Sequence, residues 1–252
     1  MSLRFHEIVE KNHHILNPLS DEKLMLLGEI CHLEPGMRQL DLACGKGEML
    51  CQWAKHFGIE GTGVDISTVF LDAARKRAEE LDVSDKLSFV QEDAATYQSE
   101  PDSYDIISCI GANWIGGGTQ GTLELVKTKG LKASSDTLIL MGEVFWRKEP
   151  SEEALTAIGV QRGEWAVGLE QLVEIFEDSD THLVEMVIAT DTEWDRYESM
   201  HWWTFESWMQ ENQDDPEFDQ IVDFVKESRL NYFRYVRPLC DWGVFVLKPK
   251  RN

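Results

Sequence analysis

The sequence predicts an α/β protein built on a doubly wound, mostly parallel sheet of seven strands. Short apolar segments alternate with longer segments of helical periodicity through the first two thirds of the chain. The connections between the short segments are long enough for crossover helices, which is typical of a sheet covered on both faces. Such crossovers are right-handed, which makes the predicted sheet doubly wound.

Capping and turn residues define the first elements. Segment 19–33 carries apolar side chains at helical spacing behind Ser20, which is placed as an N-cap, and Pro35-Gly36 ends this helix. We expect residues 37–43 to form the first strand. The next helix is expected at 46–57, a segment rich in Met, Leu, Trp and Phe.

The later elements continue the alternation of strand and helix. Further strands are expected at 60–65, 86–91, 104–110, 136–142, 183–190 and 242–247. Further helices are expected at 67–81 and 119–130, and a helical region at 151–178.

The segment between the last two strands is too long for a hairpin. Its aromatic residues recur every three or four positions, as on one stripe of a helix: Trp194, Tyr197, His201, Phe205 and Trp208. We therefore expect a helical substrate-side insertion at 191–240 that folds back on the sheet. The expected layout is a single domain, 1–252, with an N-terminal lid or helix at 1–36 and a ligand-binding core at 37–148.

Composition excludes some partners. The chain has 252 residues, and its 24 Lys and Arg against 46 Asp and Glu give a formal net charge of −22. Nucleic acids and anionic membranes are bound through basic side chains, so we expect neither. The five Cys show no zinc-binding spacing, so we expect no metal site and free thiols. No apolar leader or membrane-length apolar run occurs, and the expected location is cytoplasmic.

A glycine turn joins the first expected strand to the following helix, in the run Leu40-Asp41-Leu42-Ala43-Cys44-Gly45-Lys46-Gly47-Glu48-Met49. Glycines there let the backbone approach a ligand, and the helix N-terminus offers free N–H groups. A tight turn without a ligand is the alternative for a Gly-x-Gly sequence taken alone.

Three acidic residues strengthen the interpretation as a binding site. Asp41, Asp65 and Asp93 fall at the carboxyl ends of the first three strands, where open α/β sheets bind ligands. A carboxylate at Asp65 can accept both hydroxyls of a ribose, and Asp93 is placed to meet an adenine edge. The alternative for each is a helix cap or a loop carboxylate.

The glycine turn also separates the possible adenosine cofactors. A dinucleotide fingerprint requires Gly-x-Gly-x-x-Gly, but Leu50 stands at the third glycine position. Asp41 suits an ammonium group, such as that of S-adenosylmethionine, better than a pyrophosphate. An NAD-type oxidoreductase on a Rossmann domain is therefore the runner-up.

The runs LDLACGKGEML, GVDIS, FVQEDA and YDIISCIGANW together resemble the ordered motifs of class I S-adenosylmethionine-dependent methyltransferases, over roughly residues 20–145. Within that family the chain is similar to a poorly characterised bacterial small-molecule branch. The features that carry this similarity are His13 or His14 before Asn17-Pro18, and Gly142-Glu143 before Trp146-Arg147.

The resemblance implies a role for each matching position. Asp41 and the turn from Ala43 through Gly45 to Gly47 would hold the methionine end, and Asp65 the ribose. The residues implied around adenine and near the sulfur are Ile66, Asp93, Ala94, Cys109 and Ile110. Ala43 departs from the family, which more often has Gly there.

Several residues are candidates for the acceptor side. Glu143, at the end of the fifth strand, is the first candidate for general base or substrate anchor, and His14 the second. Asn113 and Trp114 are expected to shape the substrate side. Aromatic residues of the insertion are lid candidates, with core packing as their alternative: Tyr197, Trp202 and Trp203.

The expected function is S-adenosylmethionine-dependent methyl transfer to a small-molecule acceptor by in-line displacement, with a non-catalytic S-adenosylmethionine-binding protein as a further alternative. Residues 149–223 hold 21 acidic residues and only two basic ones, together with five of the nine Trp. An acidic, aromatic substrate side favours a cationic or neutral acceptor.

Overall fold

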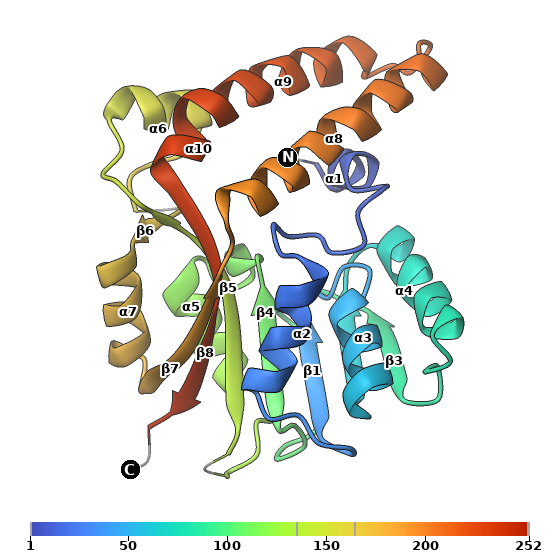
Figure 1. The fold of residues 1–252 in the computed structure, drawn as a ribbon, viewed down its shortest axis with the longest axis vertical. Coiled ribbons are helices and arrows are strands. Elements are labelled where there is room, and N and C mark those ends of the chain that lie inside the picture. The colour runs from blue at the N-terminus through green and yellow to red at the C-terminus, as the bar shows by residue number, and fades with distance from the viewer. Residues whose placement is uncertain (1, 135, 164, 251–252) are drawn as a thin grey trace.

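The fold is a single mixed sheet flanked by helices, as the sequence predicts (Figure 1). A computed structural model describes residues 2–134, 136–163 and 165–250. The sheet order is β3-β2-β1-β4-β5-β8-β7; neighbours from β3 to β5 pair in parallel, and β8 is antiparallel to both β5 and β7. The strands are β1 (Arg38–Leu42), β2 (Glu60–Asp65), β3 (Leu87–Gln91), β4 (Ile106–Ile110), β5 (Leu138–Trp146), β7 (Thr181–Ile188) and β8 (Cys240–Pro249).

Helices cover both faces of this sheet. The helices that connect or flank the strands are α2 (Asp21–Ile30), α3 (Glu48–Phe57), α4 (Thr68–Glu80), α5 (Thr119–Lys127) and α7 (Leu169–Asp178). One buried cluster joins α2, α3 and α4 to the sheet through residues such as Leu27 and Trp53. Another cluster joins α5 and α7 to the opposite face through Leu123 and Phe176. This double covering explains why the strands β4 and β5 are almost continuously apolar.

Side-chain caps start several helices where the sequence analysis expects. The Ser20 hydroxyl accepts from the backbone N–H of Lys23 at the start of α2, and Ser67 accepts from Phe70 at the start of α4. Helix α3 instead begins at Gly47, whose left-handed φ of 65° turns the chain out of the loop after β1.

The two largest differences from the predicted elements lie at β5 and in the segment 151–178, and most other predicted ends differ by one to three residues. Strand β5 continues to Trp146, four residues past the predicted end at 142, because β8 pairs with it from Ile139 to Trp146. The predicted helical region 151–178 is two helices, α6 (Glu152–Ile158) and α7. Between them the chain makes a turn and a two-residue strand, β6 (Val167–Gly168), which pairs with the end of β5.

The helical insertion lies above the carboxyl ends of the strands (Figure 1). It consists of α8 (Asp191–Glu211), α9 (Phe218–Asn231), a π-helical turn (Tyr232–Val236) and α10 (Arg237–Leu239). The expectation that it folds back on the sheet is wrong for most of its length. Trp194 reaches the core beside the sheet, whereas Phe205 and Trp208 pack on Phe5 and Val9 of the N-terminal helix α1 (Leu3–Val9).

The apolar stripe of α8 is therefore covered by the apolar face of α1 rather than by the sheet.

Within the described residues, no helix combines the length and the apolar character that a membrane crossing requires.

Candidate active site

A large cavity opens at the carboxyl ends of the parallel strands. Its volume is about 1270 Å³. Pockets that hold one small ligand are commonly ~300–1,000 Å³, so this cavity is larger than a single small ligand needs. Its walls come from the loops after β1 to β4, from residues within β5, from the segment between α1 and α2, and from the insertion helices α8 and α9.

Asp41, Asp65 and Asp93 all line this cavity. Strands β1, β2 and β3 are adjacent and parallel, so their carboxyl ends bring the three residues to one edge. Asp65 accepts backbone N–H groups from Gly45 and Ser67, each at 2.8 Å, and so ties the end of β2 to the glycine turn. Asp93 accepts the N–H of Ala95 at 2.9 Å, which is the loop-carboxylate alternative, yet it still faces the cavity.

Burial raises the pKa of two of these carboxyls. The pKa of Asp41 is raised to about 7, mainly by burial; a hydrogen bond from Ser108 opposes the shift and the nearby Asp65 charge adds to it. Burial also raises the pKa of Asp65, against the backbone N–H groups of Ser67 and Gly45. Part of the Asp41 population is therefore protonated near neutral pH.

Three alternate residues of the glycine turn adopt left-handed backbone. Ala43 has φ 58°, Gly45 φ 54° and Gly47 φ 65°. A Cβ at Gly45 would lie 2.6 Å from Leu16 Cδ1, so the absence of a side chain lets the N-terminal segment close over the turn. Ala43 adopts the same conformation without the freedom of glycine, which costs roughly 1–2 kcal/mol.

Glu143 projects from β5 into the cavity and is almost completely buried. Its Oε2 accepts a 2.9 Å hydrogen bond from Asn113 Nδ2, while its buried Oε1 has no hydrogen-bond partner among the described residues. Burial raises the pKa of Glu143 to about 8, and the hydrogen bonds from Asn113 and Thr119 offset only part of that shift. A buried carboxyl with a free oxygen is suited to exchange a proton or to bind a donor.

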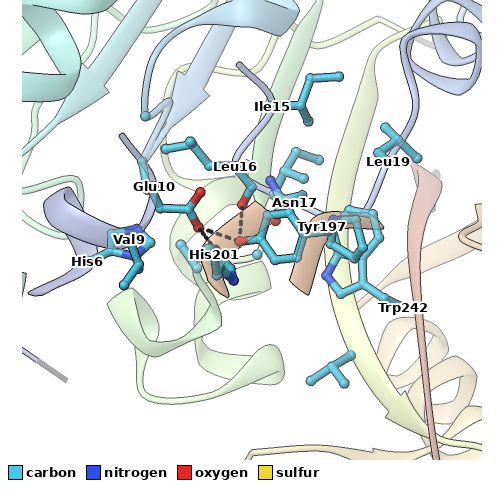
Figure 2. Close-up of a pocket in the computed structure, with 18 of the residues that line it drawn as sticks. His6, Val9, Glu10, Ile15, Leu16, Asn17, Leu19, Tyr197, His201 and Trp242 are labelled. Atoms are coloured by element: carbon cyan, nitrogen blue, oxygen red, sulfur yellow. Dashed lines mark hydrogen bonds and ion pairs between the residues drawn. The ribbon is translucent and has the colours of Figure 1, made fainter. Parts of the chain in front are cut away.

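The insertion meets the N-terminal segment at Glu10, as Figure 2 shows. Tyr197 Oη donates to Glu10 Oε1, and His201 Nε2 lies 3.0 Å from the same oxygen. His13 Nδ1 lies 3.0 Å from Glu10 Oε2, and its Nε2 lies 3.0 Å from the backbone oxygen of Tyr197. Burial lowers the pKa of His201, but hydrogen bonds with Glu10 and Glu198 outweigh it and raise that pKa to about 9.

Lys46 connects this segment to the glycine turn. Its Nζ donates to the backbone oxygens of Glu10, Lys11 and His13 at 2.7, 2.9 and 2.8 Å. Lys46 belongs to the loop after β1, so one side chain fixes the turn after α1 over that loop.

Comparison with known proteins now decides the family. Residues 40–124 match a methyltransferase domain. The uncharacterised protein YjhP of Escherichia coli K12 is 40% identical over 245 residues, which cover 97% of both chains. A crystal structure of an S-adenosylmethionine-dependent methyltransferase from Geobacter sulfurreducens, in complex with S-adenosylhomocysteine, is 39% identical, covers 99% of both chains and superposes with a TM-score of 0.92. The chain belongs to the S-adenosylmethionine-dependent methyltransferases. A second such complex, from Thiobacillus denitrificans, is 38% identical with 99% coverage of both chains and a TM-score of 0.91.

S-adenosylmethionine is accordingly the cofactor of this methyltransferase, and the cavity fits it. Acidic residues stand at three successive strand ends, and Ala43 and Gly45 of the glycine turn line the cavity between them. Ile66 is 57% exposed although it is a large apolar residue lining the cavity, so a flat apolar ligand group would cover it. The NAD-type oxidoreductase alternative is set aside by the family.

Most of the predicted site residues line the cavity of the methyltransferase. They are Asp41, Ala43, Gly45, Asp65, Ile66, Asp93, Ala94, Ile110, His14, Asn113, Trp114, Glu143, Tyr197 and Trp202. His14 is exposed, unlike the neighbouring His13.

Three predicted residues lie outside that lining. A Cβ at Gly47 would meet Phe89 and Ala74, so this glycine serves helix packing. The Cys109 side chain is buried, with Sγ 3.7 Å from the oxygen of Ala112. Trp203 is 75% exposed because it projects from the outer side of α8.

The sequence analysis overlooked Glu10 and treated His13 only as an alternative to His14. Glu10 directly follows α1, a helix not predicted as an element of its own, and its partners come from a distant part of the chain. The helical stripe containing Tyr197 and His201 was a signal that this face needs a partner. Nothing in the stripe identifies Glu10 as that partner.

Proposed function

We propose that this methyltransferase transfers a methyl group to a small-molecule acceptor held between the strand ends and the insertion helices. The observation that carries the proposal is the continuity of the cavity: one space is lined by Asp41 and Asp65 on one side and by Tyr197 and Trp202 on the other. An acceptor bound under α8 would therefore share its enclosure with the cofactor.

The proposed cofactor contacts follow from the chemistry of each residue. Asp41 would bind the ammonium group of the methionine part, beside the Ala43–Gly45 turn. Asp65 would accept the ribose hydroxyls with the lone pairs that its two backbone contacts leave free. Asp93 and Ala94 would meet the adenine edge, over Ile66.

Glu143 is the proposed general base or substrate anchor. The cofactor supplies an electrophilic methyl group on a sulfonium, and in-line displacement from it depends mostly on positioning. A base is needed only where the acceptor arrives protonated. With a pKa near 8, Glu143 has a higher proton affinity than an ordinary carboxylate, and its unpartnered Oε1 is available to accept that proton. His14, at the exposed rim, is the second candidate.

The cavity lining favours a cationic or neutral acceptor. Among the described lining residues, eight are acidic and Lys46 is the one Lys or Arg. Five Trp line the same space: Trp114, Trp165, Trp194, Trp202 and Trp242. Aromatic faces and carboxylates both attract organic cations, and the aromatic surface also suits a neutral apolar molecule. Asn113 would orient Glu143 toward either.

A screen for methyl transfer tests this function. The protein and its Glu143→Gln variant are incubated with methyl-labelled S-adenosylmethionine and a library of amines, neutral metabolites and organic acids, and label in small products is measured. We expect products from amines or neutral compounds with the wild type and at least a tenfold slower reaction with the variant. Tight cofactor binding without any product would instead favour the non-catalytic alternative. Label found only in added proteins would overturn the small-molecule proposal.

A further inference from the structure

The cluster of Glu10, His13 and His201 has a ligand set that metal ions use. It joins the turn after α1 to helix α8, and the potential ligand atoms of the three side chains all lie within 4.8 Å of one another. Two imidazoles and a carboxylate form the protein ligands of several catalytic zinc and iron sites. We propose that this cluster is a binding site for a first-row divalent transition-metal ion, with zinc as the probe.

The distances suit such an ion. Each histidine nitrogen that faces Glu10 lies 3.0 Å from a carboxylate oxygen. Zinc bonds of ~2.0–2.2 Å place neighbouring tetrahedral ligand atoms about 3.3 Å apart. The two nitrogens approach different oxygens of the Glu10 carboxylate, and the three ligand atoms lie within 4.8 Å of one another, so the side chains would need to rotate to bring all three to that spacing.

The outer nitrogens of both histidines face oxygen atoms, His13 within hydrogen-bond distance and His201 at ion-pair distance. A metal-bound histidine almost always donates its other N–H to a carbonyl or a carboxylate. His13 Nε2 faces the backbone oxygen of Tyr197 at 3.0 Å, and His201 Nδ1 faces Glu198 Oε2 at 3.7 Å. These contacts leave the inner nitrogens, His13 Nδ1 and His201 Nε2, directed at Glu10.

Two buried atoms of the cluster depend on each other alone. Glu10 Oε2 and His13 Nδ1 lie 3.0 Å apart as a buried pair, and neither makes a hydrogen bond to any other described residue. With His13 Nε2–H donating to Tyr197, Nδ1 can face the carboxylate in two ways: as the second N–H of an imidazolium, or as a lone pair that binds a metal ion. Glu10 is 1% exposed and His13 6%, so the positive charge that compensates the carboxylate is held within the cluster.

The surroundings hold the ligands in place before an ion arrives. Lys46 binds the backbone oxygens of Glu10 and His13, and Tyr197 binds Glu10 Oε1 (Figure 2). Glu10 and His201 also line the cavity. The ion would therefore connect the N-terminal segment and α8 at the edge of the acceptor space.

Direct metal binding tests the site. The full chain is stripped with a chelator, and zinc affinity and stoichiometry are measured in competition with a chromogenic chelator, alongside the melting temperature. We expect one tightly bound zinc per chain and a higher melting temperature with zinc. His13→Gln and His201→Gln should each weaken zinc binding by at least about 100-fold, more than the loss of an outer-sphere partner costs.

His182→Gln is the matched control, because His182 pairs with Glu177 at 3.2 Å in an exposed position. It should leave zinc affinity unchanged. Cobalt bound to the wild type should give visible absorption bands of a site with nitrogen and oxygen ligands, and this readout remains if a variant fails to fold. If the wild type binds zinc or cobalt no more tightly than folded His13→Gln does, the proposal is overturned. The cluster is then stabilised by protonated histidines paired with Glu10. Equal loss in His182→Gln would overturn the proposal as well.

Discussion

Ser108 donates a 2.6 Å hydrogen bond to Asp41 Oδ1, and the two residues are direct partners in the parallel pairing of β4 with β1. The Ser108 hydroxyl itself receives a hydrogen bond from Gln39 at 3.0 Å. These two hydrogen bonds fix the carboxyl of Asp41 at the cofactor edge of the cavity. The carboxyl is only partly ionised at neutral pH, because burial raises its pKa to about 7. The proposed contact of Asp41 with an ammonium group therefore makes cofactor binding depend on pH.

We expect S-adenosylhomocysteine to bind about tenfold more weakly at pH 6 than at pH 8, since a pKa near 7 leaves about a tenth of Asp41 ionised at pH 6. The sign follows from the raised pKa: the ammonium group binds the anion, and the anion is lost as the pH falls. Calorimetry in buffers of different ionisation enthalpy should show proton release near one at pH 6. Asp41→Asn should bind weakly at both values, and a wild-type affinity that does not change between them would contradict the proposed contact.

Glu143 should make the protein less stable as the pH rises from about 4.5 to about 8. Its pKa of about 8 lies above the value of 4.5 for an exposed Glu. The folded state therefore holds a proton that the unfolded state releases, and stability falls as the pH rises from about 4.5 through about 8. Glu143→Gln keeps the acceptor for Asn113 but does not ionise. The free energy of unfolding of Glu143→Gln, minus that of the wild type, should therefore rise by a few kcal/mol between about pH 4.5 and about pH 8.

Urea unfolding at several pH values, read by tryptophan fluorescence, measures this difference. Glu124→Gln, an exposed carboxylate paired with Lys127, serves as the control and should show no such trend. A constant difference between Glu143→Gln and the wild type from pH 5 to pH 9 would mean that Glu143 is already ionised in the folded protein.

The sequence predicts those parts of the fold that depend on local pattern. The apolar runs of β4 and β5 and the caps at Ser20 and Ser67 are local, and the meeting of Asp41 with Asp65 follows from parallel strand ends lying at one edge. The end of β5 was not predictable locally, because its last residues are strand only through pairing with β8.

Contacts between distant segments account for what the sequence analysis missed in the site. Glu10 acquires its partners from α8, which lies near the other end of the chain, and no spacing rule connects it with His201. The exposure of Trp203 follows from the packing of α8 on α1: the helical period indicates an apolar stripe but does not show which partner covers it.

Ala43→Gly should stabilise the protein. Ala43 adopts φ 58°, a conformation that destabilises the folded state by roughly 1–2 kcal/mol for an L-residue. Gly removes this strain, but its greater freedom in the unfolded chain destabilises the folded state by about 0.4–1 kcal/mol. We expect a net gain below about 1 kcal/mol, or a melting temperature higher by about 2 °C. Calorimetry checks it. Ala74→Gly, inside α4, should have the opposite effect, and a fall for both variants would show that Ala43 is not strained.

Gly45→Ala should weaken cofactor binding beyond its effect on stability. Gly45 and Gly36 both have positive φ, 54° and 86°, so Ala at either costs roughly 1 kcal/mol of stability. The new methyl group at position 45 would also lie 2.6 Å from Leu16 Cδ1 and displace the N-terminal segment, whereas nothing lies within 4 Å at position 36. Calorimetric titration should show at least tenfold weaker S-adenosylhomocysteine binding for Gly45→Ala and wild-type affinity for Gly36→Ala. Equal S-adenosylhomocysteine affinities of Gly45→Ala and Gly36→Ala would show that the position of Leu16 does not affect cofactor binding.

Phe205→Ala should release the N-terminal helix from the insertion. Phe205 is 2% exposed and belongs to the cluster that joins α8 to Phe5 and Val9. Deleting a buried Phe side chain commonly costs 3–5 kcal/mol, and here the loss falls on the α1–α8 contact rather than on the sheet. Hydrogen exchange should therefore accelerate in residues 3–9 and in α8 while β1 and β4 stay protected. Phe233→Ala, at a position that is 53% exposed, is the control and should leave the exchange of residues 3–9 unchanged. Uniformly faster exchange, with β1 and β4 affected as much as α1, would mean that the insertion and the sheet unfold as one unit.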